Sequence, residues 1–411
     1  MFNAHKSQLV ILLATSLRVM ANDPLILTIQ QGGTTVQSGF SSIDNLISTA
    51  KNTASIQSAY PNLNFNPANP ATVGLNYLGN NLTLATTAFT NNSQQLTLTL
   101  DQINHTVTGS GASATAARQD AFNQMQSYLK TNGGNLWTLL QKQVVASTPF
   151  SIIAGNPASL QSIQASNDFQ NAFINPTIQV NGASPDHIPN LFGLGFTHGQ
   201  FSQNGIDVSF NTLPLSYTWR SNSDAGKQLI LSMPISEGTV GGARVYSAQP
   251  ALGARFPINE HWSLSPFLGV GFSGSSDLGQ ATVESSTSLT SDYNIPLADN
   301  RYAAIGNMIG YYKTLRFTAG GYTVDPDIHN TIFRNGLMLG TPVSNMLSME
   351  FSYINTLFTG VQTYTRNQNE VGLSLGARHE LTGWISNLRG GFSYVHARDI
   401  HGMRFDFGVW F

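Results

Sequence analysis

The 411-residue chain contains no cysteine, so disulfide bonds, thiolate nucleophiles and cysteine-ligated metal sites are excluded. Charged residues are scarce at 10% of the chain, against roughly 25% in ordinary soluble domains. The formal net charge of −2 gives no basis for general attraction to nucleic acid, so we expect no nucleic-acid partner. No run of about 18 or more apolar residues occurs, which argues against a transmembrane helix.

Threonine, serine, asparagine, glutamine and glycine fill the places that charged residues would take, and the mean hydropathy is −0.08. This composition fits neither a disordered polyelectrolyte nor a helical membrane protein. It is typical of membrane β-barrels, in which half of each strand is apolar and the other half polar. Polar β-solenoids can share it.

The N-terminus has the pattern of a secretory signal. A short basic start containing Lys6 precedes an apolar segment from Leu9 to Leu17, and small Ala21 offers a cleavage point. We therefore predict a signal peptide over residues 1–21, although Arg18 is unusual so close to the cut. A buried first helix is the alternative.

The composition changes near Pro185-Asp186. Residues 1–186 carry 12 aromatic and 12 charged residues, and residues 187–411 carry 29 and 28. We therefore divide the chain into a polar N-terminal region, 22–186, and a second part, 187–411.

The N-terminal region combines strand and helix patterns. Period-two alternation such as Leu96-Thr97-Leu98 predicts short strands over 25–108. Three helices are predicted after them, at 115–131, 136–146 and 157–173. Gly133-Gly134 ends the first, and Asn156-Pro157 begins the third. In the third helix Ala165, Phe169 and Phe173 share one stripe.

From His187 onward, segments of about ten residues alternate between apolar and small or polar side chains. Residues 262–272 and 371–378 show the pattern clearly, and such lengths suit tilted strands that cross a membrane. Twelve segments begin near residues 188, 206, 228, 243, 261, 301, 315, 331, 346, 369, 386 and 401. Residues 280–292 are a weaker candidate, which we interpret as a loop or a strand extension. The predicted fold is mainly β, with an antiparallel transmembrane β-barrel of about 12 strands behind a mixed strand and helix region.

The connections between these segments also alternate in length. If Phe411 lies on the periplasmic side, the predicted periplasmic turns include Lys313-Thr314, and the outer loops include 275–300. The outer set is longer except at Arg398–Ile400, as expected for bacterial outer-membrane barrels.

The last strand resembles the terminal strand of outer-membrane proteins, with Phe405, Phe407, Val409 and Phe411 on one face. In that family this strand is the assembly signal. The resemblance implies that the barrel-assembly machinery, periplasmic chaperones, outer-membrane lipid and lipopolysaccharide are partners. Twelve strands behind a helix resemble the autotransporter β-domain. The oligomeric state is not indicated.

Assigning the apolar residues to lipid places several arginines in the lumen, among them Arg334 and Arg404. Five are predicted near the periplasmic mouth as a pore-lining basic ring: Arg220, Arg255, Arg316, Arg378 and Arg389. Such a ring would favour anions or dock a polar segment. The alternative is that these arginines pair with carboxylates and fill a narrow lumen.

Two histidine clusters are the candidates for catalysis: His198 with Ser202, and His396 with Asp399 and His401. Neither offers an assignable third group for a hydrolytic triad, and His396 and His401 lack a third metal ligand. We therefore predict no enzyme activity, catalytic residue, metal or cofactor.

The favoured function is an autotransporter-like translocator or surface-display protein of the outer membrane. The alternative is a passive, porin-like channel whose N-terminal segment is periplasmic or plugs the pore. The helix at 157–173 is the segment that could occupy the lumen, since a twelve-stranded barrel holds little more than one helix.

Overall fold

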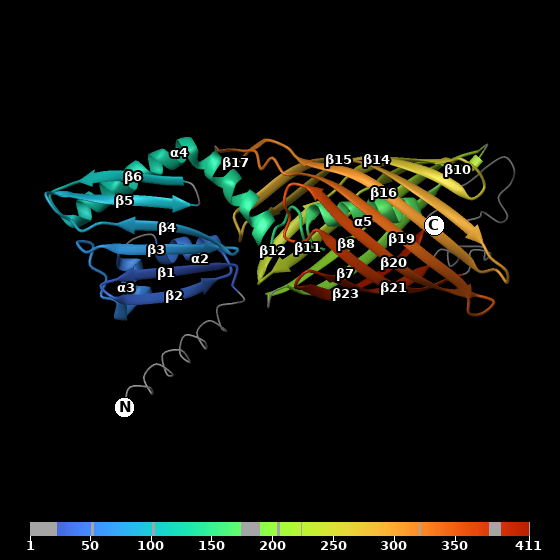
Figure 1. The fold of residues 1–411 in the computed structure, drawn as a ribbon, viewed down its shortest axis with the longest axis horizontal. Coiled ribbons are helices and arrows are strands. Elements are labelled where there is room, and N and C mark those ends of the chain that lie inside the picture. Colours follow the sequence, from blue (N-terminus) through green and yellow to red (C-terminus); the bar gives the residue numbers. More distant parts are fainter. Residues whose placement is uncertain are drawn as a thin grey trace, which may run out of the picture.

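The computed structural model describes residues 23–50, 53–100, 103–173, 190–203, 206–222, 224–319, 322–377 and 388–410. Two units lie end to end, a sheet-and-helix unit and a barrel (Figure 1). We call residues 23–147 the N-terminal domain and residues 191–410 the barrel. Among the described helices, none is both long enough and apolar enough to span a membrane. The predicted signal peptide and Phe411 lie outside the described residues.

The N-terminal domain is built on an antiparallel sheet with the strand order β2-β1-β3-β4-β5-β6. Its strands are β1 (Leu25–Gln31), β2 (Thr34–Phe40), β3 (Ala71–Tyr77), β4 (Asn80–Thr86), β5 (Ser93–Leu100) and β6 (Ile103–Ser110). Helix α4 (Ala114–Ser147) packs against β5 and β6. Short helices α2 (Ile43–Ala50), α3 (Thr53–Ala59) and η1 (Pro61–Leu63) complete the domain. Alternate residues of β1 and β5 are buried, so the sheet has one core face.

The predicted break between residues 131 and 136 is wrong, because α4 continues through Gly133-Gly134. A Cβ atom on Gly134 would lie 2.2 Å from the carbonyl oxygen of Thr323. Gly134 therefore allows a barrel loop to approach the helix closely, and that approach outweighs the low helix propensity of glycine.

The barrel is a closed antiparallel sheet of twelve strands. Nine of them are single elements: β7 (Leu191–Gln203), β14 (Trp262–Ser275), β15 (Gln280–Pro296), β16 (Tyr302–Thr314), β19 (His329–Pro342), β20 (Leu347–Gly360), β21 (Asn367–Ala377), β22 (Arg389–Ala397) and β23 (Ile400–Trp410). Three are divided: β8 (Ile206–Leu213) with β9 (Leu215–Ser221), β10 (Asp224–Ser232) with β11 (Ile235–Val240), and β12 (Ala243–Ala248) with β13 (Ala251–Pro257). The barrel closes where β7 pairs with β23 on one side and with β8 and β9 on the other.

Each divided strand is interrupted at a proline: Pro214, Pro234 or Pro250. Proline has no amide hydrogen and cannot donate to a sheet ladder. Its carbonyl still accepts from the neighbouring strand, as in the 3.0 Å bond from Val270 N to Pro250 O. The strand therefore bends while the barrel wall remains joined.

The outer face of the barrel is apolar and the lumen face is polar. Leu268, Val371 and Phe351 on the outer face are 65%, 58% and 49% exposed, whereas Thr290 and Glu350 on the lumen face are buried. A soluble protein would reverse this arrangement. The prediction of a mainly β fold with a C-terminal transmembrane barrel of twelve strands is confirmed.

The predicted number of barrel strands is correct because two errors compensate: one strand was missed, and one hairpin was counted as a strand. Residues 280–296 form the full strand β15, not a loop, so the predicted long connection 275–300 is two short turns around a strand. The segment near 315 is no barrel strand but a separate hairpin of β17 (Phe317–Ala319) and β18 (Tyr322–Val324). Lys313-Thr314 therefore precedes a long loop and is no periplasmic turn. The alternation between short and long connections is therefore less regular in the structure than the sequence predicted.

The connections define two ends of the barrel. We call one the domain mouth, with the connections 241–242, 276–279, 315–328, 361–366 and 398–399. The other, which we call the C-terminal mouth, contains the turns 258–261, 297–301 and 343–346 and the end of β23. The N-terminal domain lies against the domain mouth (Figure 1).

We expect Leu373→Arg to destabilise the barrel more than Ser374→Arg. Leu373 is 41% exposed on the outer face, where an arginine near the bilayer midplane costs about 2–4 kcal/mol. Ser374 faces the lumen and donates a 2.7 Å hydrogen bond to Glu350, which could pair with a new arginine. Urea titration of both variants in lipid vesicles measures the difference. The reverse order would mean that the two faces are exchanged.

Candidate functional site in the barrel lumen

The chain leaves the N-terminal domain through a buried turn that fills the domain mouth. Residues 148–156 are buried throughout. Ser151 Oγ accepts the backbone N–H of Ile153 at 3.1 Å, and Asn156 Nδ2 donates to Ser151 O at 2.6 Å. The backbone of Leu160 donates to Ile152 O at 2.9 Å, which turns the chain toward the lumen. The predicted N-terminal cap at Asn156-Pro157 thus belongs to this turn, and the helix begins later.

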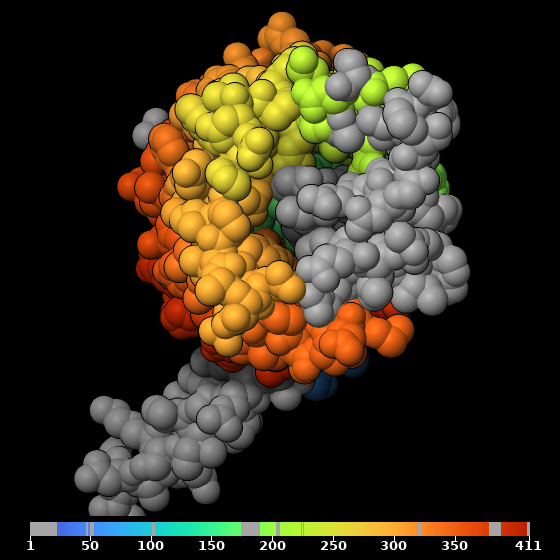
Figure 2. All heavy atoms as spheres, turned by 90° about the vertical axis from the view of Figure 1, so that its right-hand side faces the viewer, coloured from blue at the N-terminus to red at the C-terminus, as the bar shows by residue number. Residues whose placement is uncertain are grey.

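Helix α5 (Leu160–Phe173) runs through the lumen from the domain mouth toward the C-terminal mouth. Viewed from the C-terminal mouth, atoms of the barrel border a hollow in which green atoms of the chain's middle part are visible (Figure 2). We therefore take the wall around α5 as the candidate functional site. The sequence offered this placement as one possibility for the helix at 157–173.

A ladder of polar side chains joins α5 to strand β15. Gln161 donates to Glu284 at 2.9 Å, Gln164 donates to Ser286, and Ser288 donates to Asp168 at 2.9 Å. The helix residues follow the spacing i, i+3, i+7, and the strand residues follow i, i+2, i+4, so one helix face meets one strand face. We call these three pairs the α5–β15 ladder. The sequence showed the apolar stripe of this helix, but it did not show which strand would meet the polar residues on its other side.

The apolar stripe of α5 packs against neighbouring strands where glycines leave room. Phe169 is buried and lies against Gly306 and Gly336, where an added Cβ would come within 2.8 Å of its ring. Ala165 and Phe173 join the same cluster, with Met308, Ile332 and Ile354 of the wall. The guanidinium of Arg334 lies 5.5 Å from the Phe169 ring centroid. The stripe predicted from Ala165, Phe169 and Phe173 thus faces the wall of β16, β19 and β20.

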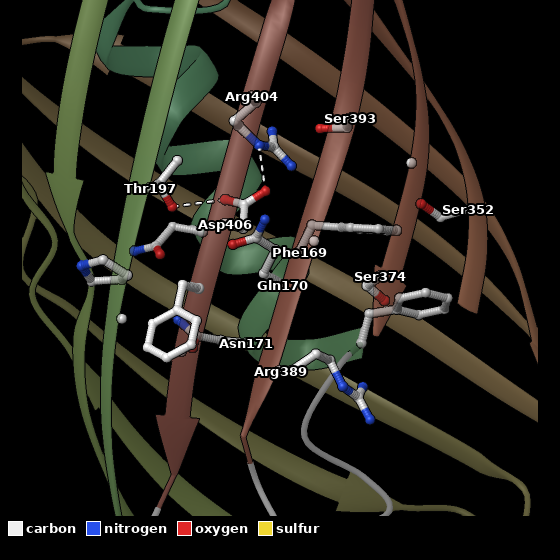
Figure 3. A pocket seen from close by; sticks show the side chains of 18 of the residues that line it. Phe169, Gln170, Asn171, Thr197, Ser352, Ser374, Arg389, Ser393, Arg404 and Asp406 are labelled. Carbon is white, nitrogen blue, oxygen red and sulfur yellow. Dashed lines mark hydrogen bonds and ion pairs between the residues drawn. The ribbon is translucent and has the colours of Figure 1, made fainter. Parts of the chain in front are cut away.

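A cavity of about 170 Å³ lies between α5 and strands β7 and β20–β23, and Phe169 and Phe173 of the helix are among the residues that line it. Gln170 and Asn171 reach this cavity from the helix, and Ser352, Ser374 and Ser393 line it from the strands (Figure 3). Arg404 Nε donates to Asp406 at 2.9 Å, and Thr197 donates to the other oxygen of Asp406 at 2.7 Å. The α5–β15 ladder therefore holds the helix against one wall, and a cavity lined by both apolar and charged side chains remains beside it.

The five arginines of the predicted ring do not all reach the lumen. Arg220, Arg255 and Arg389 lie in strands near the C-terminal mouth, and Arg378 lies outside the described residues. Arg316 is no lumen residue: it is 73% exposed in the connection before β17 and lies 3.8 Å from Asp325. The sequence misplaced it because the hairpin was read as a barrel strand.

Several lumen arginines face carboxylates. Arg255 pairs with Asp292 at 3.1 Å and Arg389 with Glu350 at 2.9 Å. Arg334 pairs with Glu370 at 3.2 Å. Arg255 also donates at 2.9 Å to the carbonyl of Ala172, where the negative end of the α5 dipole favours a cation. Paired in this way, the arginines contribute less positive field to the lumen than a free ring would.

The histidine clusters lie on the outer face of the barrel. His198 Nδ1 is 2.8 Å from the side-chain oxygen of Asn211. His396 and His401 are opposite each other on β22 and β23, and the carboxylate of Asp399 accepts from the hydroxyl of Tyr364 at 2.8 Å. Within the described ranges, no group of three or more His, Asp or Glu residues could hold a metal ion.

Three of the four predicted assembly-signal residues, Phe405, Phe407 and Val409, belong to β23, the strand that closes the barrel, and Phe411 lies outside the described residues. Phe405 and Phe407 are 47% and 46% exposed on the outer face of β23, and this strand pairs with β22 and β7. Their role in assembly stays a prediction, together with that of Val409 and Phe411.

The N-terminal domain is fastened to the loops of the domain mouth. The hydroxyl of Tyr77 donates to Leu278 O at 2.8 Å, and the backbone of Ile43 donates to Asp277 O at 2.7 Å. Burial raises the pKa of Tyr77. Lys142 donates to Asp327 at 3.1 Å and lowers the pKa of that carboxyl group. Buried Leu278 and Ile328 extend the core of the domain into the barrel loops.

These features decide the class of the barrel: the strands close on themselves, the outer face is apolar, and the lumen is polar. It is an outer-membrane barrel. Its location is the bacterial outer membrane.

No family model and no curated protein sequence matches the chain. Among solved structures, the β-domain of the Bordetella autotransporter BrkA has 15% identity and a TM-score of 0.41, with 54% of this chain and 98% of that one covered. The translocator domain of the autotransporter NalP from Neisseria meningitidis has 13% identity and a TM-score of 0.42, with 61% and 96% covered. The KdgM porin has 11% identity and a TM-score of 0.33, with 53% and 98% covered.

The Arg255–Asp292 pair makes a testable prediction about the lumen. Both side chains are 2% exposed, so Arg255→Met should leave a buried carboxylate without its cation and cost about 3–5 kcal/mol. Adding Asp292→Leu removes that carboxylate and should restore most of the lost stability. Denaturant titration of the single and double variants in vesicles measures both effects. Additive losses in the double variant would contradict the pairing.

Proposed function

We propose that this outer-membrane barrel anchors its N-terminal domain and presents it at the outer surface, in the manner of an autotransporter. The path of the chain carries the proposal. It leaves the domain at one mouth, passes through the lumen as α5, and begins the barrel at the other mouth. A domain that entered the barrel wall from the periplasm would need no segment inside the lumen.

The orientation follows from the position of the last strand. β23 ends at the C-terminal mouth, and the resemblance to terminal strands of outer-membrane proteins implies that this mouth is periplasmic. The N-terminal domain then lies outside. In this proposal the barrel-assembly machinery and chaperones act from the periplasmic side, and lipid and lipopolysaccharide surround the apolar outer face.

The lumen limits how the domain could reach that side. A twelve-stranded barrel holds little more than one helix, and α5 already takes most of this space. The six-stranded domain cannot pass in its folded form. The absence of cysteine means that no disulfide would hinder passage of the unfolded chain. The role proposed here is non-catalytic.

A single-cysteine experiment tests the orientation, because the natural chain has no cysteine. Gln95→Cys lies on an exposed position of the N-terminal domain, and Met346→Cys lies in a turn of the C-terminal mouth, where Met346 is 60% exposed. With intact cells, a membrane-impermeant maleimide should label Gln95→Cys and leave Met346→Cys unlabelled. Both should react after the outer membrane is broken. Labelling of only Met346→Cys on intact cells would reverse the orientation and refute surface presentation.

A passive channel is the second candidate, favoured by the cavity beside α5 and its charged lining. We expect the intact protein to conduct poorly in planar bilayers, since α5 and the turn at 148–159 fill the lumen and its mouth. Deleting residues 24–174 should raise the conductance severalfold. Equal, high conductance of both proteins would favour the channel over display.

A further inference from the structure

The sheet of the N-terminal domain carries no charge. None of its six strands contains Asp, Glu, Lys or Arg. Its face opposite the core presents threonine, asparagine and glutamine, such as Gln37, Gln95 and Thr106, all exposed. Sheets of soluble domains usually protect their edges with charged residues, proline or bulges, because free backbone groups pair readily with other strands.

The two edges of this sheet differ. Helix α4 covers the β6 edge: Gln124 donates to Thr108 O at 2.9 Å, and Asp120 accepts the backbone N–H of Ser110 at 2.9 Å. At the β2 edge, no such cap occurs within the described part of the chain. β2 is also free of bulges, because its register with β1 is unbroken from Thr34 to Phe40.

We propose that β2 pairs in antiparallel fashion with β2 of a second copy of this chain. A seven-residue strand can align in full with itself, which places Gln37 opposite Gln37 of the second copy. β2 has no charged residue that could face a like charge in this arrangement, and the Asp23 carboxylate beside Gly39 lies near the end of the strand rather than opposite its own copy. The contact is symmetric, and α4 caps the other edge of each sheet, so the assembly stops at two copies rather than growing into a fibre.

The same geometry sets the orientation of the two barrels. The strands of the N-terminal sheet run roughly along the long axis of the molecule, which is also the axis of the barrel (Figure 1). Antiparallel pairing of β2 with its copy therefore points the barrels in opposite directions. Two copies joined in this way lie in opposing membranes rather than side by side in one membrane. The pairing itself does not depend on the proposed surface presentation.

A charge exchange at the centre of β2 tests the pairing in the full-length protein in detergent. By analytical ultracentrifugation, we expect the natural protein to form dimers as its concentration rises. Gln37→Lys alone and Gln37→Glu alone should each weaken the dimer about tenfold or more, because like charges then face each other. Mixing the two variants should restore dimers, since opposite charges now meet. Restoration also shows that both variants are folded.

Gln95→Lys is the matched control, because it adds the same charge to the same face of the sheet on β5, four strands from β2. It should leave the dimer unchanged. A natural protein that stays monomeric at all concentrations would overturn the proposal. So would Gln37→Lys dimers as stable as the natural ones, or loss of dimers in Gln95→Lys, which would indicate contact through the sheet face.

Discussion

The α5–β15 ladder is the interaction on which the rest of the barrel interior depends. Hydrogen bonds from Gln161 and Gln164 to β15 fix both the rotation and the depth of the helix. With its polar stripe held there, the apolar stripe must face β16, β19 and β20, where Phe169 enters the space left by two glycines. Buried polar groups lose free energy unless they find partners. A helix with one polar and one apolar stripe is stable in this lumen because the wall offers polar partners on β15 and apolar partners on β16, β19 and β20.

Because α5 packs closely against some strands of the wall, a cavity remains between it and the others. The strands that meet the helix carry glycine and serine where the backbones approach, whereas β7 and β21–β23 stand farther away and border the cavity of about 170 Å³. Ion pairs such as Arg404 with Asp406 occupy part of that space. A charged side chain in a narrow lumen needs an oppositely charged partner or water. The arginines and carboxylates therefore fill the lumen mainly as ion pairs that neutralise one another. Any selectivity of an opened lumen would come from the balance of these pairs.

Much of the fold could be predicted from the sequence, because alternation between lipid-facing and lumen-facing residues is imposed on every strand. β15 was not predicted as a barrel strand because Ser285, Thr287 and Ser291 occupy outer-face positions where apolar residues were expected. The hairpin near 317 was taken for a strand because its local alternation is the same, and only pairing tells the two apart. In the candidate site, the stripes of the lumen helix could be predicted. Its partners Glu284 and Ser288 could not, since contact across more than a hundred residues leaves no local pattern.

The chain passes from the N-terminal domain into the lumen through a single segment, and this explains which residues occur in the turn at 148–156. The turn at 148–156 must bury polar backbone groups, and Ser151 and Asn156 supply the hydrogen bonds that make this possible. Beyond the turn, Tyr77 and Leu278 bind the domain to the loops, so the small sheet does not rely on its own core alone. The domain, the turn and the lumen helix therefore form one continuous packed path. A change that loosens α5 should be felt at the domain, because no flexible linker separates the two.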